Sequence, residues 1–122
     1  MKIKSYKDLI VWQKSIDLVI LIYKLTKKFP KEEMYGLSSQ MKRAGVSISS
    51  NIAEGSRRGT KKDFRHFLLN SFGSGAELET QIKISKELLL VDEKEFVKID
   101  GILNEVMKML NKLISGLEDN NK

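Results

Sequence analysis

Apolar residues recur every three or four positions along several stretches of the sequence, and this spacing places them on one face of an α-helix. The clearest stretch lies near the C-terminus and alternates by three and four without a break: Phe96, Ile99, Leu103, Val106, Leu110, Leu113 and Leu117. Another keeps the same step but includes small residues: Phe64, Leu68, Ser71, Gly75, Leu78, Ile82, Ser85 and Leu89. We expect the small residues to let this helix approach a neighbouring helix closely.

Signals for the beginning and end of a helix separate these stretches. Thr60 precedes Asp63 by three residues, as in a capping box, so a helix is expected to begin there. Gly59 is expected to end the helix before it, and Pro30, the single proline, follows the end of an earlier one. The sequence therefore predicts an all-α fold with helices over about residues 7–28, 33–57, 61–89 and 93–117, in one domain that spans residues 1–122.

The first predicted helix is apolar on more than one face. One row consists of Leu9, Trp12, Ile16, Val19, Ile20 and Tyr23, whereas Leu18, Leu21, Ile22 and Leu25 point elsewhere. A soluble monomer seldom leaves a large apolar patch in water, so part of this helix needs a cover. A symmetric homo-oligomer is the simplest cover. The alternative is that this helix lies at the centre of the bundle.

A mostly polar row runs beside the apolar seam of the second predicted helix, and the third helix carries a matching row. The two rows consist of Gln40, Ala44, Ser47, Asn51, Glu54 and Arg58 on the second helix and of Asn70, Ser74, Glu77 and Gln81 on the third. If the helices fold back about Gly59, residues whose numbers sum to about 121 face one another. The facing pairs are then Asn51 with Asn70, Ser47 with Ser74, Ala44 with Glu77 and Gln40 with Gln81.

We expect this polar row to point inward and to have a structural role, because buried polar side chains that find partners fix the register of two packed helices. Glu54 also precedes Arg58 by four residues, a spacing that permits an ion pair along one helix. Arg43 is expected within reach of Glu77 across the hairpin. A catalytic role for Asn51 is the alternative.

Charge is unevenly distributed along the chain. The 122 residues carry a net charge of +6, but residues 1–66 hold 15 Lys and Arg against 6 Asp and Glu, a net +9, and residues 67–122 hold 7 against 10, a net −3. Such a distribution can attract polyanions, or it can bring acidic and basic faces of identical subunits together. Composition does not choose between these alternatives.

Composition also limits the chemistry and the location that can be expected. The chain has no cysteine and His66 is its one histidine, so neither a metal site nor a cofactor is predicted. The longest dense apolar stretch, Leu18 to Tyr23, is far too short to span a membrane. The basic N-terminus lacks the apolar stretch of a secretory signal, which makes the cytoplasm the expected location.

Known catalytic arrangements of helical bundles do not match the sequence. A di-iron site needs Glu-x-x-His motifs from two helices, and His66 with Asp63 supplies only one related fragment. A serine nucleophile such as Ser47 would lack a second histidine as its base. The segment from Gly73 to Gly75 lies inside a helical seam rather than between a strand and a helix, so it is not a phosphate loop. We therefore expect no enzymatic activity.

The turn between the second and third predicted helices is strongly basic. Its cations are Arg57, Arg58, Lys61, Lys62 and Arg65, with Lys42 and Arg43 farther along the second helix. Such a cluster, together with free amides at the start of a helix, can bind phosphates, so these residues are candidate nucleic-acid contacts. A solvated turn without a ligand is the alternative. The nearby aromatic residues, Phe64 and Phe67, are expected in the apolar seam, so binding should show little sequence selectivity.

Four segments of the sequence resemble a known family. They are YKDLIVWQKS from Tyr6, FPKEEMYGL from Phe29, QMKRAGVSISSNIAEGSRR from Gln40 and GSGAELETQI from Gly73. The family consists of four-helix bundle proteins first noted as reading frames within intervening sequences of bacterial 23S ribosomal RNA genes. Departures are small: Gly45 stands where the family usually has an alanine-like residue, and Ser49 where it often has proline.

The resemblance implies an antiparallel up-down-up-down bundle that assembles as a ring-shaped homopentamer and has no established enzymatic activity. The family is also similar to the accessory subunit of diversity-generating retroelements, a basic pentamer that binds reverse transcriptase and nucleic acid. Two hypotheses follow. The protein is a non-catalytic oligomeric scaffold that binds RNA or DNA through the basic turn, or it is an adaptor that binds an acidic partner protein or a reverse transcriptase.

Overall fold

The computed structural model of the protein describes residues 5–118. It contains four long helices, α1 (Ile10–Thr26), α2 (Leu37–Arg57), α3 (Lys61–Glu87) and α4 (Val97–Gly116). Short turns of 3-10 helix occupy Tyr6–Asp8, Lys31–Glu33 and Glu93–Phe96. The predicted all-α fold is confirmed, and the part of the chain that the structure describes contains no strand.

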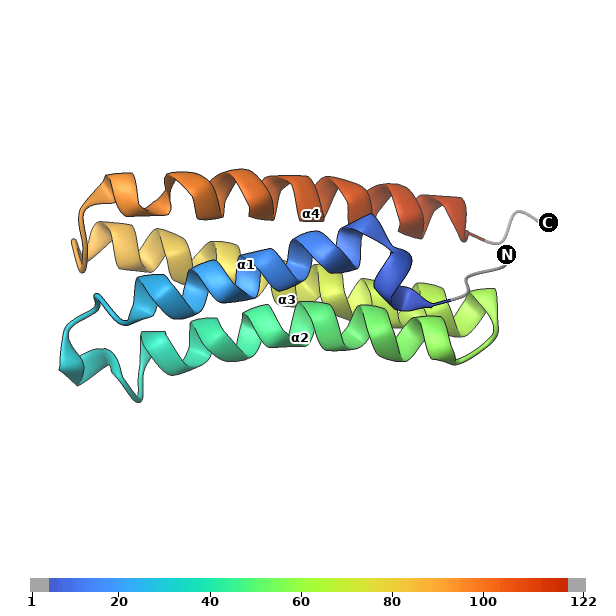
Figure 1. Ribbon diagram of the computed structural model, residues 1–122, viewed down its shortest axis with the longest axis horizontal. Coiled ribbons are helices and arrows are strands. Elements are labelled where there is room, and N and C mark those ends of the chain that lie inside the picture. The colour runs from blue at the N-terminus through green and yellow to red at the C-terminus, as the bar shows by residue number, and fades with distance from the viewer. Residues whose placement is uncertain (1–4, 119–122) are drawn as a thin grey trace.

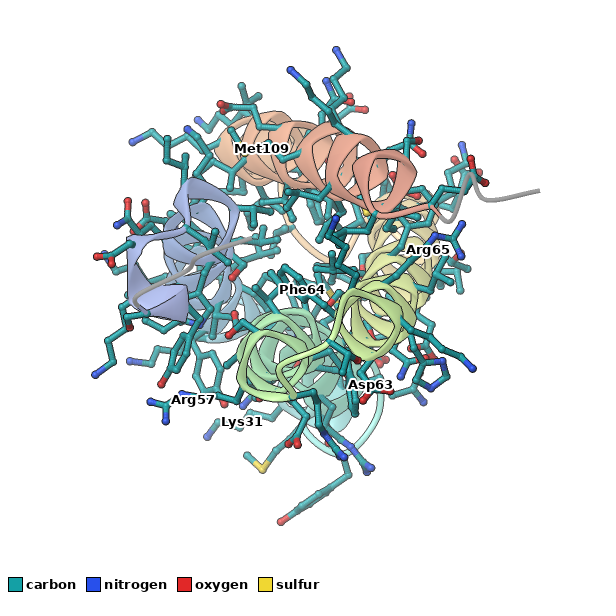
Figure 2. The ribbon with its side chains drawn as sticks, turned by 90° about the vertical axis from the view of Figure 1, so that its right-hand side faces the viewer. Lys31, Arg57, Asp63, Phe64, Arg65 and Met109 are labelled. Carbon is teal, nitrogen blue, oxygen red and sulfur yellow. The ribbon has the colours of Figure 1, made fainter. Side chains whose placement is uncertain are left out.

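The helices form a bundle in which each helix packs against two others. Helices α1 and α3 both pack against α2 and α4. In Figure 1 consecutive helices run in opposite directions, and the α2–α3 turn lies at the opposite end from the two other connections. The end-on view of Figure 2 shows α2 and α4 diagonally opposite each other. Helix α1 therefore occupies one corner of the bundle, and the alternative that it lies at the centre is wrong.

All four helices contribute to the core, and the apolar seams predicted for α3 and α4 form the side that these two helices supply. All the predicted seam residues of α3 from Phe64 to Ser85 are buried. In α4 the seam is buried as far as Leu110, and the two last predicted members are only partly buried. A side chain at Gly75 would overlap Met107 of α4. The small residues of α3 thus allow the close approach of helices that the sequence predicts.

Leu89, the last residue predicted for the α3 seam, lies outside the core. Helix α3 ends at Glu87, and Leu89 has a φ of 55°, in the left-handed region that commonly ends helices. The amide of Leu90 donates to the carbonyl oxygen of Ser85 at 3.3 Å and closes this turn. The side chain of Leu89 is 84% exposed. The apolar spacing continued past the point where the backbone leaves the helix.

The connection between α2 and α3 forms as predicted. Gly59 has a φ of 86°, which favours glycine, and it follows the end of α2. The Thr60 hydroxyl oxygen accepts a hydrogen bond from the amide of Asp63 at 3.1 Å and caps α3. The other three helices begin later than predicted because a 3-10 turn precedes each of them. Before α1, for example, Leu9 is extended and separates that turn from the helix.

Helix α1 buries a different face from the row that begins with Leu9 and Trp12. Its core face is formed by Val11, Ser15, Leu18, Ile22, Leu25 and Thr26. Members of the other row lie at the surface, where Ile20 is 49% and Tyr23 is 43% exposed. The apolar surplus predicted for this helix is therefore present on the outside of the bundle.

Candidate nucleic-acid interface

The basic cluster lies at the end of the bundle where α2 turns into α3. Arg57, Arg58, Lys61 and Lys62 are all exposed there. They flank Gly59, and we call these four residues the basic corner. In Figure 2, which looks onto this end, Arg57 projects away from the bundle while Phe64 lies between the helices. The turn therefore presents exposed cations next to the apolar core.

The cations of the basic corner differ in their partners. The Arg58 Nε donates to Glu54 Oε2 at 3.2 Å, and its guanidinium lies 4.9 Å from the centroid of the Phe67 ring. The guanidinium of Arg57 lies 5.5 Å from the centroid of the Tyr6 ring. Within residues 5–118, no carboxylate forms an ion pair with Arg57, Lys61 or Lys62. These three charges remain available to a ligand.

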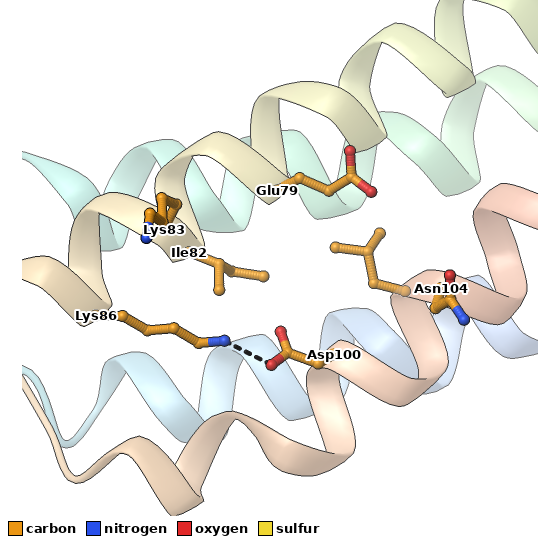
Figure 3. Close-up of a pocket in the computed structure, with 7 residues that line it drawn as sticks. Glu79, Ile82, Lys83, Lys86, Asp100 and Asn104 are labelled. Atoms are coloured by element: carbon orange, nitrogen blue, oxygen red, sulfur yellow. Dashed lines mark hydrogen bonds and ion pairs between the residues drawn. The ribbon is translucent and has the colours of Figure 1, made fainter.

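Carboxylates on and beside α4 neutralise one cation on α1, one just after α1 and one on α3. The ion pairs are Lys14 with Glu105 at 2.9 Å, Lys28 with Glu95 at 2.7 Å and Lys86 with Asp100 at 2.7 Å. Figure 3 shows the Lys86–Asp100 pair beside a cavity of about 170 Å³ between α3 and α4. Helix α2 lies diagonally across the bundle from these carboxylates and contains a single acid, Glu54. Geometry therefore leaves the cations at the end of α2 less neutralised than those beside α4.

Arg65 does not join the basic corner. Its Nε donates to the carbonyl oxygen of Ile114 at 3.2 Å, and its terminal nitrogen lies 3.7 Å from the carboxylate of Glu118. Figure 2 shows Arg65 on the α4 side of α3, well away from Arg57. A cation that donates to the last carbonyl groups of a helix stabilises that end. Arg65 thus ties α3 to the C-terminal end of α4.

Lys42 and Arg43 lie near the beginning of α2, at the far end of the bundle from the corner. The 15 residues between Lys42 and Arg57 correspond to about 22 Å along a helix that rises about 1.5 Å per residue. Both cations line a groove of about 730 Å³ between α1 and the start of α2. Its other lining residues are Tyr23, Met34, Tyr35, Ser39, Val46 and Ser47.

We call this hollow the tyrosine groove. The Lys42 Nζ lies 5.2 Å from the centroid of the Tyr23 ring, and Tyr35 is 91% exposed. This groove was not predicted from the sequence, where aromatic residues were considered only beside the basic corner. The available signal was the Met-Tyr pair at residues 34–35, between a proline and a helix, where an exposed aromatic residue has no apolar seam to join.

The polar row between α2 and α3 makes fewer cross-helix contacts than expected. Ser47 Oγ and Ser74 Oγ lie 2.8 Å apart, as the facing pairs require. Asn51 donates instead to the carbonyl and hydroxyl oxygens of Ser47 on its own helix, at 2.9 and 3.1 Å. Glu54 pairs with Arg58 along α2. One predicted pair therefore bridges the hairpin by a hydrogen bond.

The inward orientation predicted for this row is wrong for half of its members. Gln40, Glu54, Arg58, Asn70 and Glu77 are exposed, whereas Ala44 and Ser74 are buried. The row is displaced around α2 from the seam that faces the core, so it lies along the rim of the hairpin. There a groove of about 330 Å³ is lined by Gln40, Arg43, Ala44, Ser47, Glu77 and Gln81. Among the described residues, Arg43 and Glu77 share this groove without forming an ion pair.

Other hydroxyl groups connect the helices in the interior. Ser15 Oγ on α1 and Ser49 Oγ on α2 lie 2.9 Å apart, and both residues are buried. Ser71 of α3 donates to the carbonyl oxygen of Ile48 at 2.9 Å. Ser71 was predicted in the apolar seam of α3, whereas the contact between Ser15 and Ser49 was not predicted. Small hydroxyl residues at seam positions were the signal for both contacts.

Neither a metal centre nor a membrane span emerges from the described part of the chain. His66 is exposed and packs edge-on against Phe67, with ring centroids 5.6 Å apart. Over residues 5–118, no group of three His, Cys, Asp or Glu side chains is placed to hold a metal ion. The same residues include no helix with the length and apolar character needed to cross a bilayer.

Comparison with known proteins places this bundle in a family. The sequence matches the family described as 23S rRNA-intervening sequence protein over residues 7–112. The fold is similar to the crystal structure of a protein with unknown function from the S23 ribosomal protein family of Bacteroides thetaiotaomicron, with a TM-score of 0.79 and 24% sequence identity over 86% of this chain and 98% of that chain. No curated protein matches the sequence. Because the family match covers most of the chain, the protein belongs to the 23S rRNA-intervening sequence protein family.

Proposed function

We propose that this protein is a non-catalytic, homo-oligomeric scaffold of the cytoplasm that binds nucleic acid through its basic corner. The observation that carries the proposal is the exposure of Arg57, Lys61 and Lys62 on one turn, without a carboxylate partner in residues 5–118. A phosphate backbone is the ligand that such a cluster fits best, because each neutralised phosphate releases condensed counterions.

The corner favours backbone contacts over recognition of bases. Phe64 is 2% exposed and Phe67 lies beneath the guanidinium of Arg58, so neither ring is free to stack on a base. Contacts to phosphates position a protein on nucleic acid but carry little sequence information. We therefore assign the corner to sequence-tolerant binding of RNA or DNA.

Self-association would strengthen such weak contacts. Helix α1 exposes apolar side chains that do not line the tyrosine groove, with Ile10 at 60% and Ile20 at 49%. An apolar strip of this kind supports the proposal that identical subunits cover it, in a ring of five as the family resemblance implies. Several corners held in one assembly would raise the overall affinity without any new contact at each site.

The test removes the unpaired charges of the corner and compares the result with a matched change elsewhere. The variant Arg57→Ala/Lys61→Ala/Lys62→Ala lowers the net charge from +6 to +3. The control Lys98→Ala/Lys108→Ala/Lys112→Ala makes the same change on the exposed side of α4, where none of these lysines forms an ion pair within the described residues. Only the corner variant should lose binding.

Binding is measured by fluorescence anisotropy with a labelled duplex of about 20 base pairs at about 50 mM salt. We expect the corner variant to bind about tenfold more weakly and to make the negative slope of log K against log salt shallower by about 2.7, since each lost phosphate contact removes about 0.9. Equal loss in both variants would show that net charge alone attracts the duplex. Circular dichroism checks that each variant keeps its helices.

An adaptor for an acidic protein or a reverse transcriptase is the second candidate function. The observation in its favour is the exposed apolar surface beside Lys42 and Arg43, since patches of this kind often mark protein interfaces. Capture of partners from the native cell, with and without nuclease, separates the two functions. A partner retained after nuclease treatment would support the adaptor, and nucleic acid recovered without such a partner would support the scaffold.

A further inference from the structure

We infer that the tyrosine groove binds an unpaired nucleotide, with the Tyr35 ring stacked on the base and Lys42 and Arg43 beside its phosphates. The inference rests on the proposed binding of nucleic acid and deepens it, because it names single-stranded nucleic acid as the preferred substrate class. It also places a second contact at the opposite end of α2 from the basic corner. The corner by itself would not distinguish single strands from duplexes.

Two exposed aromatic residues line the groove. Tyr35 is 91% exposed, which is unusual for a large ring that gains free energy when it leaves water. Tyr23, on α1, is 43% exposed and lines the same groove. Aromatic rings with a free face are the platforms on which proteins stack unpaired bases, and the interaction tolerates any base because every base has a π-face.

The groove is positively charged. Lys42 and Arg43 are its charged lining residues, and no carboxylate lines it. The Lys42 ammonium already lies 5.2 Å from the centroid of the Tyr23 ring, so cation and ring occupy one short stretch of surface. In residues 5–118 neither Lys42 nor Arg43 forms an ion pair. A ligand that combines a flat ring with an adjacent anion matches this arrangement, and a nucleotide has both parts.

A single strand fits the groove better than a duplex does. The bases of a duplex are stacked on one another and present only their edges, so a protein ring cannot reach their faces. A single strand exposes these faces and has a flexible backbone that can follow a groove. The hollow of about 730 Å³ also has room for a base and its sugar. The groove should therefore add affinity for single strands and leave duplex binding to the corner.

The experiment compares one labelled single strand, oligothymidylate of about 20 nucleotides, with a duplex of about the same length by fluorescence anisotropy at about 50 mM salt. Tyr35→Ala should weaken binding of oligothymidylate about tenfold, while its affinity for the duplex should change less than about twofold. Tyr35→Phe keeps the ring and should bind oligothymidylate as the unchanged protein does. Val97→Ala, which truncates a side chain that is 67% exposed at the same end of the bundle, is the matched control.

A spectroscopic signal tests the stacking itself. Tyr35→Trp adds an indole to a protein whose one tryptophan is Trp12. Addition of oligothymidylate should quench the extra fluorescence, and the unchanged protein supplies the background from Trp12. The duplex should cause little quenching. Equal quenching by both probes would contradict stacking on an unpaired base.

Several results would overturn the inference while leaving the proposed function intact. Tyr35→Ala would then bind both probes as the unchanged protein does, while the corner variant loses them. If Tyr35→Ala instead lowers the sedimentation coefficient, the tyrosine belongs to a contact between subunits. If it loses polyglutamate as strongly as oligothymidylate, the groove is a site for acidic protein. An unchanged protein that binds neither nucleic acid would overturn the proposed function itself.

Discussion

Cations beside α4 are paired with carboxylates, whereas cations at the end of α2, diagonally across the bundle, are mostly unpaired in residues 5–118. Around α4, Asp100 pairs with Lys86 of α3, Glu105 pairs with Lys14 of α1, and Glu95 pairs with Lys28 just after α1. At the end of α2, Arg57 has no carboxylate partner in residues 5–118 and instead lies against the ring of Tyr6. The comparison shows that net charge alone does not reveal which cations are neutralised. We expect the exposed cations that neighbouring helices leave unpaired to mark a binding surface.

The largest expected effect comes from reversing the charges beside α4. Glu95→Lys/Asp100→Lys/Glu105→Lys removes the partners of Lys28, Lys86 and Lys14 and raises the net charge from +6 to +12. This variant should acquire a second basic surface, and its affinity for a DNA duplex at low salt should rise by more than about tenfold. Anisotropy titrations measure the change.

The reversal is checked against neutral replacements at the same positions. Glu95→Gln/Asp100→Asn/Glu105→Gln frees the same lysines without adding cations, and its affinity should lie between those of the reversed and unchanged proteins. If the reversed protein binds no more tightly than the unchanged one, unpaired exposed cations are not what determines binding.

The next effect concerns the backbone that presents the basic corner. Gly59 has a φ of 86°, and a β-carbon in this left-handed conformation costs about 1–2 kcal/mol. Gly59→Ala should lower the free energy of unfolding by about this amount in urea denaturation, and the midpoint should fall. Gly73→Ala is the control, because its position in α3 is helical and has open space around it. Replacement there should stabilise the protein by about 0.5–1 kcal/mol.

A smaller effect is expected for the hydrogen bond that bridges α2 and α3. Ser47→Ala and Ser74→Ala should each destabilise the protein by about 1 kcal/mol, because each leaves the hydroxyl of the other serine without this partner. The double variant should cost less than the sum of the two. A double-mutant cycle from urea denaturation gives the coupling. Strictly additive losses would mean that the two hydroxyl groups contribute independently.

The smallest effect is expected for the ion pair between Lys86 and Asp100 beside α4. The side chains of Lys86 and Asp100 are 26% and 44% exposed, so water screens much of their attraction. Asp100→Asn should therefore change the free energy of unfolding by less than about 1 kcal/mol. A much larger loss would indicate that ion pairs around α4 hold the bundle together. The neutralisation around α4 would then be a matter of stability first and of surface charge second.

Much of the fold was predictable because helices follow local rules. The spacing of apolar residues identified the buried faces of α3 and α4, and Gly59 with Thr60 marked the turn between α2 and α3. The family resemblance and the four-helix bundle followed from the same residues. The prediction was wrong at Leu89, because the apolar spacing continues to this residue whereas α3 ends at Glu87 and Leu89 has a left-handed backbone conformation.

The candidate site was only partly predictable. The basic corner was visible as a run of cations, but Arg65 belonged to the end of α4, and Lys42 and Arg43 belonged to a groove with Tyr35. The residues of the polar row were predicted to face one another across the α2–α3 hairpin, yet half of them are exposed at its edge. Small errors in the angle around a helix axis decide whether a side chain is buried or exposed, and spacing alone does not resolve them.

The sequence by itself determined which residues form helices, where α2 turns into α3 and which half of the chain is cationic. Apart from Arg58, which pairs with Glu54 four residues earlier, tertiary structure decided which of those cations are neutralised. Ion pairing acts over a few ångströms between residues far apart in the chain, so it depends on which helices become neighbours. In this bundle α4 lies beside α1 and α3, and the three cations within α2, across the diagonal, form no ion pair in residues 5–118.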